Sequence, residues 1–405
     1  MKKKIFAVIL DNRRMGQFFK GLETYLIDIK KFVPADVETY FIDISNLHLV
    51  KKNRIEVNVE KLGFKYLFPK NFKELYNFSK KNEIICMHRI TEIISNLRLN
   101  ILINIICSKR FIVGVDGFFI IADETKELSY YEKINVFINV KLSYYIYRIA
   151  SIFKLVSKVD ILISASKSNI EGFKKGISQK IKDKIGIDFS YFKKIYRVNS
   201  RSSINLSKKD LPEKFIVFCD SGYDHKDCIL RDGPRDDTQR EKYYQKVYNF
   251  FNYLESTLNK KVIFCQHPKT DYPQSENFEK IKRTFHTVKY ETEKYIDEAY
   301  LVIFLSSVSI SYAIALRKKI ILINSSYLGT FYQLRHALLE KEISLLKFDI
   351  DKEEYKRMDK IRLSNELNKN LNNYDKFIDE NVATNNKENH FDQIKEILNK
   401  EFFKN

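Results

Sequence analysis

The chain has 405 residues, a length that favours two or three ordinary domains. Hydrophobic residues make up 44% of it, enough for buried cores, which argues against a disordered chain. Lysine and arginine outnumber aspartate and glutamate by 71 to 52, a formal charge of +19. This excess favours anionic partners, and because it is spread along the chain it suits a basic enzyme beside phospholipid better than a nucleic-acid-binding protein.

The pattern of cysteines and the length of the apolar runs indicate the cellular compartment in which the protein works. The five cysteines form no CxxC pair and no cluster with histidine, which favours a reducing environment. The apolar run after Met1 is too short for a signal peptide, and no stretch reaches the roughly 18 uncharged apolar residues of a membrane span. The nearest candidate, 136–156, is interrupted by basic residues and is interpreted as a core helix or as a helix on a membrane surface. We therefore expect a cytoplasmic protein, working at the inner face of the cytoplasmic membrane if it docks on lipid.

In the first half of the chain, short apolar runs alternate with longer helical patterns. The run at 4–10 predicts a strand and the pattern at 16–32 predicts a helix. Further predicted strands in this half are 38–44, 83–87, 110–115 and 160–164. This alternation predicts a parallel sheet with helices on both faces.

A polar stretch at 199–213 predicts an interdomain linker, after which the alternation restarts. The predicted strands beyond it are 215–219, 261–265, 301–305 and 319–323. The predicted helices are 241–258, 291–298 and 309–316, followed by a charged helical tail from about Lys352. We therefore divide the chain into an N-terminal domain (1–205), a C-terminal domain (206–375) and a helical tail (376–405).

Two α/β domains of similar size, without a GxGxxG after the first strand, predict a GT-B-like fold: two Rossmann-like domains facing a cleft. Ligands of open α/β sheets bind at the carboxyl ends of the strands. Each of the four motifs described next directly follows a predicted strand.

The first motif is Gly114-Val115-Asp116-Gly117. A carboxylate between two glycines can be approached closely by a ligand, so Asp116 is a candidate general base and Gly117 a candidate cleft residue. The alternative is an ordinary turn in which the aspartate bonds nearby backbone amides.

The second motif is His267-Pro268-Lys269. Proline ends the strand and fixes the backbone, so the histidine and the lysine could bind phosphate oxygens at the sheet edge. The alternative is a capping histidine at an ordinary strand exit, since the dipeptide is common.

The third motif contains Ser306, Ser307 and Ser309 and leads into a predicted helix. Hydroxyls and free backbone amides at such a place suit an anion. Simple N-capping explains one of these serines equally well.

The fourth motif, Asp220-Ser221-Gly222, opens the second domain after its first strand. It is a candidate cleft segment for the acceptor or the nucleotide, or a structured turn. The pair Asp236-Asp237 does not form a DxD-centred motif and so does not indicate a metal site. We therefore expect neither metal nor cofactor beyond the donor itself.

In order and rough spacing, these motifs resemble those of the bacterial sialyltransferase and polysialyltransferase group and of related capsular Kdo transferases. Those enzymes have a GT-B fold, an acidic-acidic-Gly motif in the first domain, and an HP motif and a Ser-rich motif in the second. Val115 stands here at the first acidic position, which lowers the specificity of the match. The resemblance spans about 111–326, and its second half is similar to unassigned glycosyltransferases of polysaccharide gene clusters.

The resemblance implies an inverting, metal-independent glycosyltransferase that moves a nonulosonate or Kdo from a CMP-sugar to a bacterial surface glycan or glycolipid. Asp116 would deprotonate the acceptor, and His267, Ser306 and Ser307 would bind the leaving phosphate. A histidine and helix amides can offset the charge of a departing monophosphate.

Three other functions stay open at this point. A GT-B enzyme could use a UDP- or GDP-sugar, which would call for an arginine or lysine pair and a glutamate in the second domain. A nucleic-acid-binding protein would need its basic residues gathered on one element with aromatic residues between them. A non-catalytic polysaccharide-assembly protein would keep the fold and bind no donor.

Overall fold

The computed structural model describes residues 2–10, 19–44, 47, 58–87, 97–114, 157–167, 170–171, 192–208, 210–221, 223, 236–267, 275–305, 307, 309–384 and 388–404. These residues form two compact units. Unit 1 contains the described residues up to Gly114, those at 157–199 and those at 388–404; unit 2 contains those at 200–384.

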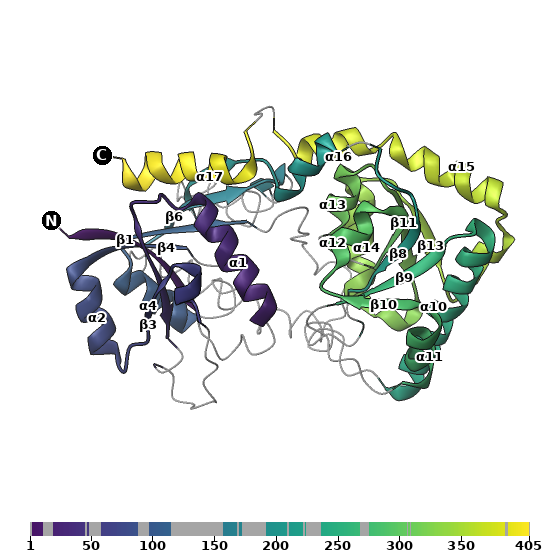
Figure 1. Cartoon of the computed structure of the whole chain (residues 1–405), viewed down its shortest axis with the longest axis horizontal. Helices are drawn as coiled ribbons and strands as arrows, with labels where there is room; N and C mark the ends of the chain where they lie inside the picture. Colours follow the sequence, from purple (N-terminus) through teal and green to yellow (C-terminus); the bar gives the residue numbers. More distant parts are fainter. Residues whose placement is uncertain are drawn as a thin grey trace, which may run out of the picture. The chain divides into compact units, whose positions relative to one another are not determined.

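Unit 1 is built on a sheet of seven parallel strands in the order β3-β2-β1-β4-β5-β6-β7 (Figure 1). The strands are β1 (Lys3–Leu10), β2 (Glu38–Asp43), β3 (Lys65–Leu67), β4 (Asn82–Met87), β5 (Lys109–Val113), β6 (Val159–Ser164) and β7 (Phe192–Arg197). The chain places β2 and β3 on one side of β1 and β4 to β7 on the other, so the strand order reverses between β1 and β4.

Helices cover both faces of this sheet. Successive residues of β1 point to opposite faces, so that Phe6 and Val8 belong to one core and Ile5 and Ala7 to the other. The first core contains side chains of α1 and α17, and the second contains side chains of α2 and α4. These helices are α1 (Phe19–Phe32), α2 (Phe72–Lys81), α4 (Leu97–Ile106) and α17 (His390–Leu398). Short helical segments, η3 (Glu60–Leu62) and a π-helical turn η8 (Asn399–Phe403), complete the unit.

Unit 2 repeats the plan with six parallel strands in the order β10-β9-β8-β11-β12-β13. The strands are β8 (Phe215–Cys219), β9 (Lys261–Gln266), β10 (His286–Lys289), β11 (Ala299–Phe304), β12 (Lys319–Asn324) and β13 (Leu346–Asp349). The order reverses between β8 and β11.

The helices of unit 2 also divide between two cores. One core holds side chains of α10 (Asp237–Leu258), α11 (Glu276–Thr284) and α15 (Lys360–Leu371), and the other holds side chains of α12 (Thr292–Asp297), α13 (Ile310–Ala315) and α16 (Tyr374–Asn381). Helix α14 (Thr330–Glu342) contributes Tyr332 to the first and Leu339 to the second. The short 3-10 helices are η5 (Arg201–Ser207), η6 (Ser326–Leu328) and η7 (Glu354–Arg357).

The long helix α10 shows how local sequence sets these bounds. Asp236 caps its first turn by accepting from the backbone N–H of Gln239 at 2.7 Å. Asn259 ends it in a left-handed conformation, with φ 51°. Between them, aromatic side chains recur on one face and form edge-to-face and stacked pairs, such as Tyr223 on Tyr243 with ring centroids 4.3 Å apart. This aromatic core fixes the helix against the sheet.

The predicted fold class is confirmed: both units are Rossmann-like parallel sheets with helices on both faces, as a GT-B-like fold requires. The predicted linker, 199–213, contains the helical turn η5, and the division between units falls at 199/200 rather than at 205/206. The predicted tail, 376–405, is divided, because α16 packs in unit 2 and α17 in unit 1.

Two expectations from composition also concern the fold. Cys86, Cys107, Cys219 and Cys265 are free thiols, and Cys228 lies outside the described residues. Among the described helices, none has the length and apolar character needed to cross a membrane. The candidate surface helix at 136–156 lies outside the described residues.

Candidate functional site

The carboxyl edge of the unit 2 sheet is the place where the predicted motifs meet. All six strands are parallel, so their carboxyl ends lie at one edge, and β9, β8 and β11 are neighbours there. The strand order reverses between β8 and β11. In open α/β sheets this reversal leaves a crevice at the carboxyl ends, where ligands bind.

His267 directly follows β9 at this edge. Its side chain is partly buried, and Cys265, two residues earlier, lies in the core beneath it. Burial raises the pKa of the Cys265 thiol to about 12, so this cysteine is protonated and unreactive at neutral pH. Pro268 and Lys269 lie outside the described residues.

Asp220 and Ser221 follow β8, the strand beside β9. Asp220 is 5% exposed, and its backbone N–H donates to the carbonyl of Cys265 at 3.0 Å, which extends the pairing of β8 and β9 by one residue. Ser221 is partly exposed and follows at the edge itself. The third residue of the motif, Gly222, lies outside the described residues.

Ser307 and Ser309 follow β11, on the other side of the reversal. The Ser307 hydroxyl oxygen accepts from the backbone N–H of Ser309 at 3.2 Å, so this serine closes the turn before α13. Ser309, at the N-cap position, makes no capping hydrogen bond with its side chain. The Ser307 hydroxyl keeps its own hydrogen for donation to a ligand oxygen. Ser306 lies outside the described residues.

Helix α14 holds the two loops that flank the reversal. The hydroxyl of Tyr332 donates to the carbonyl of Ser221 at 3.3 Å, and Nε2 of His336 donates to the carbonyl of Leu305. Both side chains are buried, with 1% and 2% of their surface exposed. One helical turn therefore fixes the loop after β8 and the loop after β11 together.

A further support fixes the loop after β12. The Asp351 carboxylate accepts from the Ser325 hydroxyl at 2.8 Å and from the backbone N–H of Ser326 at 2.6 Å. The Ser326 hydroxyl donates to it as well, at 2.6 Å. Neither this network nor α14 was predicted from the sequence. A serine pair after an apolar strand and the Tyr-x-x-x-His spacing of α14 were the available signals.

In unit 1, the strand before the first motif ends in a close approach between backbones. The Gly114 N–H donates to the carbonyl of Ile163 at 2.5 Å, and a Cβ at Gly114 would lie 3.1 Å from that oxygen and 3.0 Å from the Ser164 hydroxyl. A side chain at this position would therefore crowd the point where β5 leaves β6. Asp116 and Gly117, the candidate base and cleft residue, lie outside the described residues.

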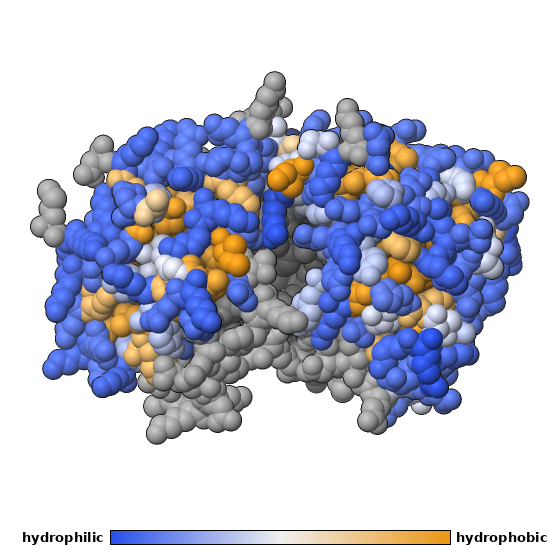
Figure 2. Space-filling view, in the orientation of Figure 1, coloured by the Kyte–Doolittle hydropathy of each residue, from blue (hydrophilic) through white to orange (hydrophobic). Residues whose placement is uncertain are grey.

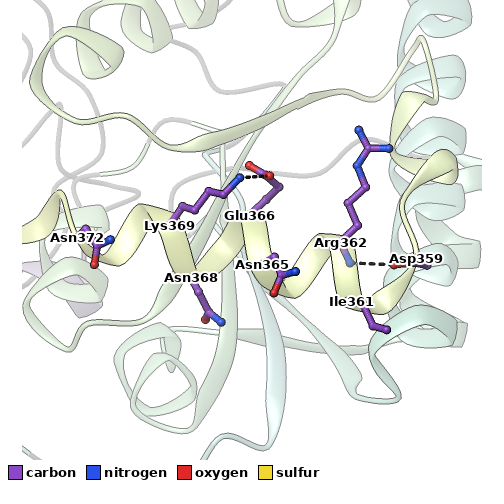
Figure 3. Close-up of a pocket in the computed structure, with 8 residues that line it drawn as sticks. All are labelled: Asp359, Ile361, Arg362, Asn365, Glu366, Asn368, Lys369 and Asn372. Carbon is purple, nitrogen blue, oxygen red and sulfur yellow. Dashed lines mark hydrogen bonds and ion pairs between the residues drawn. The ribbon is translucent and has the colours of Figure 1, made fainter.

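A hollow elsewhere on unit 2 is a poorer candidate. It follows the outer surface of α15 and is lined by Asp359, Ile361, Arg362, Asn365, Glu366, Asn368, Lys369 and Asn372 (Figure 3). Arg362, Glu366 and Lys369 point to one side of the helix and Ile361 and Asn368 to the other, so the polar groups do not converge on a ligand. Nor do the described residues contain a group of three side chains that could hold a metal ion. The edge beside β8 and β11 remains the candidate site.

Comparisons with known proteins give similar structures and no similar sequences. No family model matches the chain, and no curated protein matches it. Among solved structures, the chain is similar to the UDP-GlcNAc 2-epimerase of Methanocaldococcus jannaschii in complex with UDP-GlcNAc and UDP, with 13% identity, 98% of each chain covered and a TM-score of 0.42. It is similar to the wall teichoic acid polymerase TagF, with 11% identity, 98% of this chain and 88% of that one covered, and a TM-score of 0.48. It is also similar to Arabidopsis thaliana UGT89C1 complexed with UDP, with 9% identity, 98% and 99% covered, and a TM-score of 0.45.

Proposed function

We propose that this chain is a nucleotide-sugar-dependent glycosyltransferase that binds its donor at the carboxyl edge of unit 2. The observation that carries the proposal is the reversal of strand order between β8 and β11. Asp220 and Ser221 lie on one side of it and Ser307 on the other, with His267 on the next strand. Sequence motifs separated by up to 87 positions thus share one edge of one sheet.

The side chains at this edge suit the two ends of a nucleotide sugar. His267 and the Ser307 hydroxyl can donate hydrogen bonds to phosphate oxygens, and a positive histidine offsets the charge of a departing phosphate. Asp220 is an acceptor and suits the hydroxyl groups of ribose or of the transferred sugar. The hydrogen bonds from Tyr332 and His336 keep the loops that carry Asp220 and Ser307 in place before the donor arrives.

The donor we favour is a CMP-activated nonulosonate or Kdo. Among the described residues at the last position of each strand or within three positions after it, the basic side chains are His267, Lys289 and Lys352. In the part of the chain that the structure describes, so few cations at this edge suit a monophosphate leaving group, whereas UDP and GDP carry one charge or more beyond CMP. A UDP-sugar donor is the second candidate, and two of the three similar structures above are complexes with UDP, one of them also with UDP-GlcNAc.

The proposed reaction is an inverting transfer to a bacterial surface glycan or glycolipid. An acceptor oxygen forms a bond to the anomeric carbon while the bond from that carbon to the phosphate oxygen breaks. The electron pair leaves with CMP, and the acceptor proton passes to the carboxylate of Asp116. Neither step requires a metal, because His267 and the serines bind the phosphate directly.

Calorimetric titration with CMP, UDP and GDP at one salt concentration tests the site. We expect selective CMP binding, weakened about tenfold in His267→Ala and less in Ser307→Ala, because each loses a hydrogen bond to phosphate. The matched control is His286→Ala, which removes an exposed histidine at the opposite end of β10 and should bind CMP normally. A preference for UDP would mean that the donor is a UDP-sugar rather than a CMP-sugar. Absence of binding to all three nucleotides would favour a non-catalytic polysaccharide-assembly protein.

A separate variant tests the base. Asp116→Asn should abolish transfer while CMP still binds with unchanged affinity, because the proposed base acts on the acceptor. Normal transfer by Asp116→Asn would show that Asp116 is not the general base. It would not affect the proposal for the donor site.

A further inference from the structure

The amino edge of the unit 1 sheet, where all seven strands begin, gathers basic side chains from distant parts of the chain. We define this edge as the described residues within two positions of the first residue of each strand. It contains eleven basic side chains against four acidic ones, a formal charge of +7. The basic residues are Lys2, Lys3, Lys4, Lys65, Lys80, Lys81, Lys109, Arg110, Lys158, Lys193 and Lys194. The acidic ones are Asp36, Glu38, Glu83 and Asp160.

Two of the four acidic groups at this edge form ion pairs with the lysines around them. Glu38 lies between Lys3, 2.5 Å away, and Lys65, 2.9 Å away, and these two hydrogen bonds lower the pKa of its carboxyl to about 2. Asp160 pairs with Lys193 at 2.7 Å. Excess positive charge therefore remains after pairing, and Lys80, Lys81, Lys193 and Lys194 are exposed.

Apolar side chains are exposed beside this charge. Helix α4 ends just before β5 and so reaches the amino edge, with Ile103 and Ile106 buried against the sheet. On its outer side, Ile101 is 41% exposed and Ile105 is 52% exposed. These two residues are four positions apart and share one face of the helix. Helix α2, which ends in Lys80 and Lys81, packs beside α4.

Lysines beside exposed isoleucines fit one kind of partner. We propose that the amino edge of unit 1 docks on an anionic phospholipid bilayer, with the lysines against the headgroups and Ile101 and Ile105 entering the headgroup–acyl boundary. Lysine clusters attract anionic headgroups without fixed geometry, and apolar side chains gain free energy by leaving water at the same surface. A soluble polyanion would be held by the lysines and would gain nothing from the isoleucines. Figure 2 shows hydrophilic residues along the end of unit 1 where β1 starts in Figure 1.

Docking here would leave the opposite, carboxyl edge of the same sheet facing away from the lipid. The first motif follows β5 at that carboxyl edge. The inference does not depend on the identity of the donor, since this surface of unit 1 lies at the amino ends of the strands, opposite their carboxyl ends.

Co-sedimentation of the full chain with vesicles tests the proposal. The vesicles contain phosphatidylcholine alone, or phosphatidylcholine with about one third phosphatidylglycerol. We expect binding to the anionic vesicles only, weakening as salt rises. The variant Lys80→Gln/Lys81→Gln/Lys109→Gln should bind about 100-fold more weakly, at roughly fivefold for each lysine.

The matched control removes the same charge from unit 2. Lys242, Lys360 and Lys376 are exposed lysines on α10, α15 and α16. Their triple glutamine variant should bind within about twofold of the unaltered chain. Equal weakening by both variants would mean that the net charge of the chain attracts it, and would overturn the assignment to this edge.

A third variant separates a bilayer from a soluble polyanion. Ile101→Gln/Ile105→Gln keeps every charge and should weaken vesicle binding about tenfold, while binding to inorganic polyphosphate stays unchanged. Vesicle binding that survives this variant would overturn the membrane proposal in favour of a polyanion. Because these measurements contain no nucleotide, their outcomes are independent of whether the proposed donor site binds CMP.

Discussion

The two units share a strand plan and differ at their amino edges. Defined in the same way, the amino edge of unit 2 contains seven basic and three acidic side chains among its described residues. Helices then bring three more acids to it: Glu255 pairs with Lys261, Glu340 with Lys347 and Asp375 with Arg317. These pairs reduce its formal charge from +4 to +1, and Lys208, which pairs with Asp297 at 2.9 Å, returns it to +2. Among the described residues, unit 1 receives one such acid, Glu401, which pairs with Lys194 at 2.6 Å and leaves its edge at +6.

This difference shows how a fold can concentrate a charge that the sequence spreads out. The basic residues of the amino edge of unit 1 lie between positions 2 and 194 and form no run longer than three. Parallel strands bring all their starting points to one edge, so a lysine at the start of most strands produces a basic surface. In unit 2 the same arrangement is offset by glutamates and an aspartate on the covering helices.

The largest effect we expect concerns whether the two units are independently stable. Leu398 of α17 is fully buried in unit 1, and Leu367 of α15 is fully buried in unit 2. Changing either to alanine should lower the free energy of unfolding of its own unit by about 2–5 kcal/mol. Calorimetry should then show two transitions, with only one displaced in each variant. A single transition displaced equally by both would mean that the units unfold together.

A middle-sized effect should come from the support of the carboxyl edge by α14. His336→Ala leaves the Leu305 carbonyl unpaired in the core, a cost of about 1–3 kcal/mol, and frees the loop after β11. CMP binding should weaken about tenfold by calorimetry, and Tyr332→Phe should weaken it less. The control is Tyr355→Phe, because the buried Tyr355 hydroxyl has no hydrogen-bond partner among the described residues. Equal binding by His336→Ala and the control would show that α14 does not position the site.

The smallest effect sharpens the comparison of the amino edges. Glu38→Gln removes the carboxylate between Lys3 and Lys65, so the edge gains one unit of positive charge and anionic vesicles should bind a few-fold more tightly. The same variant should be slightly less stable at neutral pH. The folded-state pKa of Glu38 is lowered to about 2, so its contribution is present above about 4.5 and is lost as the pH falls toward 2.

Urea unfolding of Glu38→Gln and of the unaltered chain at several pH values checks the second part. The two stabilities should converge as the pH approaches 2. Glu60→Gln is the control, since Glu60 is exposed on η3 and should change neither stability nor vesicle binding. A stability difference that grows on acidification would contradict the assigned pairing.

Buried strands were the best-predicted part of the fold. Strand β8 has the predicted bounds, and β1, β2, β4, β5, β6, β9, β11 and β12 lie within two residues of theirs. They are covered on both faces, so apolar residues predominate in them and mark them in the sequence. The edge strands β3, β7, β10 and β13 were not predicted, since all four have residues of mixed polarity and form only because a neighbour provides the register.

For the candidate site, the sequence predicted which residues follow strands but could not predict what holds them. His267, Asp220 and Ser307 could be identified because each follows an apolar run. Tyr332 and His336 act through bonds to backbone carbonyls 111 and 31 positions away, and no local pattern encodes such a bond. Helix α14 itself escaped prediction because its apolar side chains divide between two cores and give no single stripe.

Helix α17 has a consequence for how the chain is made. It follows all of unit 2 in sequence, yet Ile394 and Leu398 fill the core of unit 1, and Nζ of Lys4 donates to the carbonyl of Phe402, 398 positions later. A ribosome therefore releases every strand of unit 2 before it delivers the last core residues of unit 1. Unit 1 is therefore the first to begin synthesis and the last to be completed. Part of its hydrophobic core stays exposed to solvent while unit 2 is synthesised.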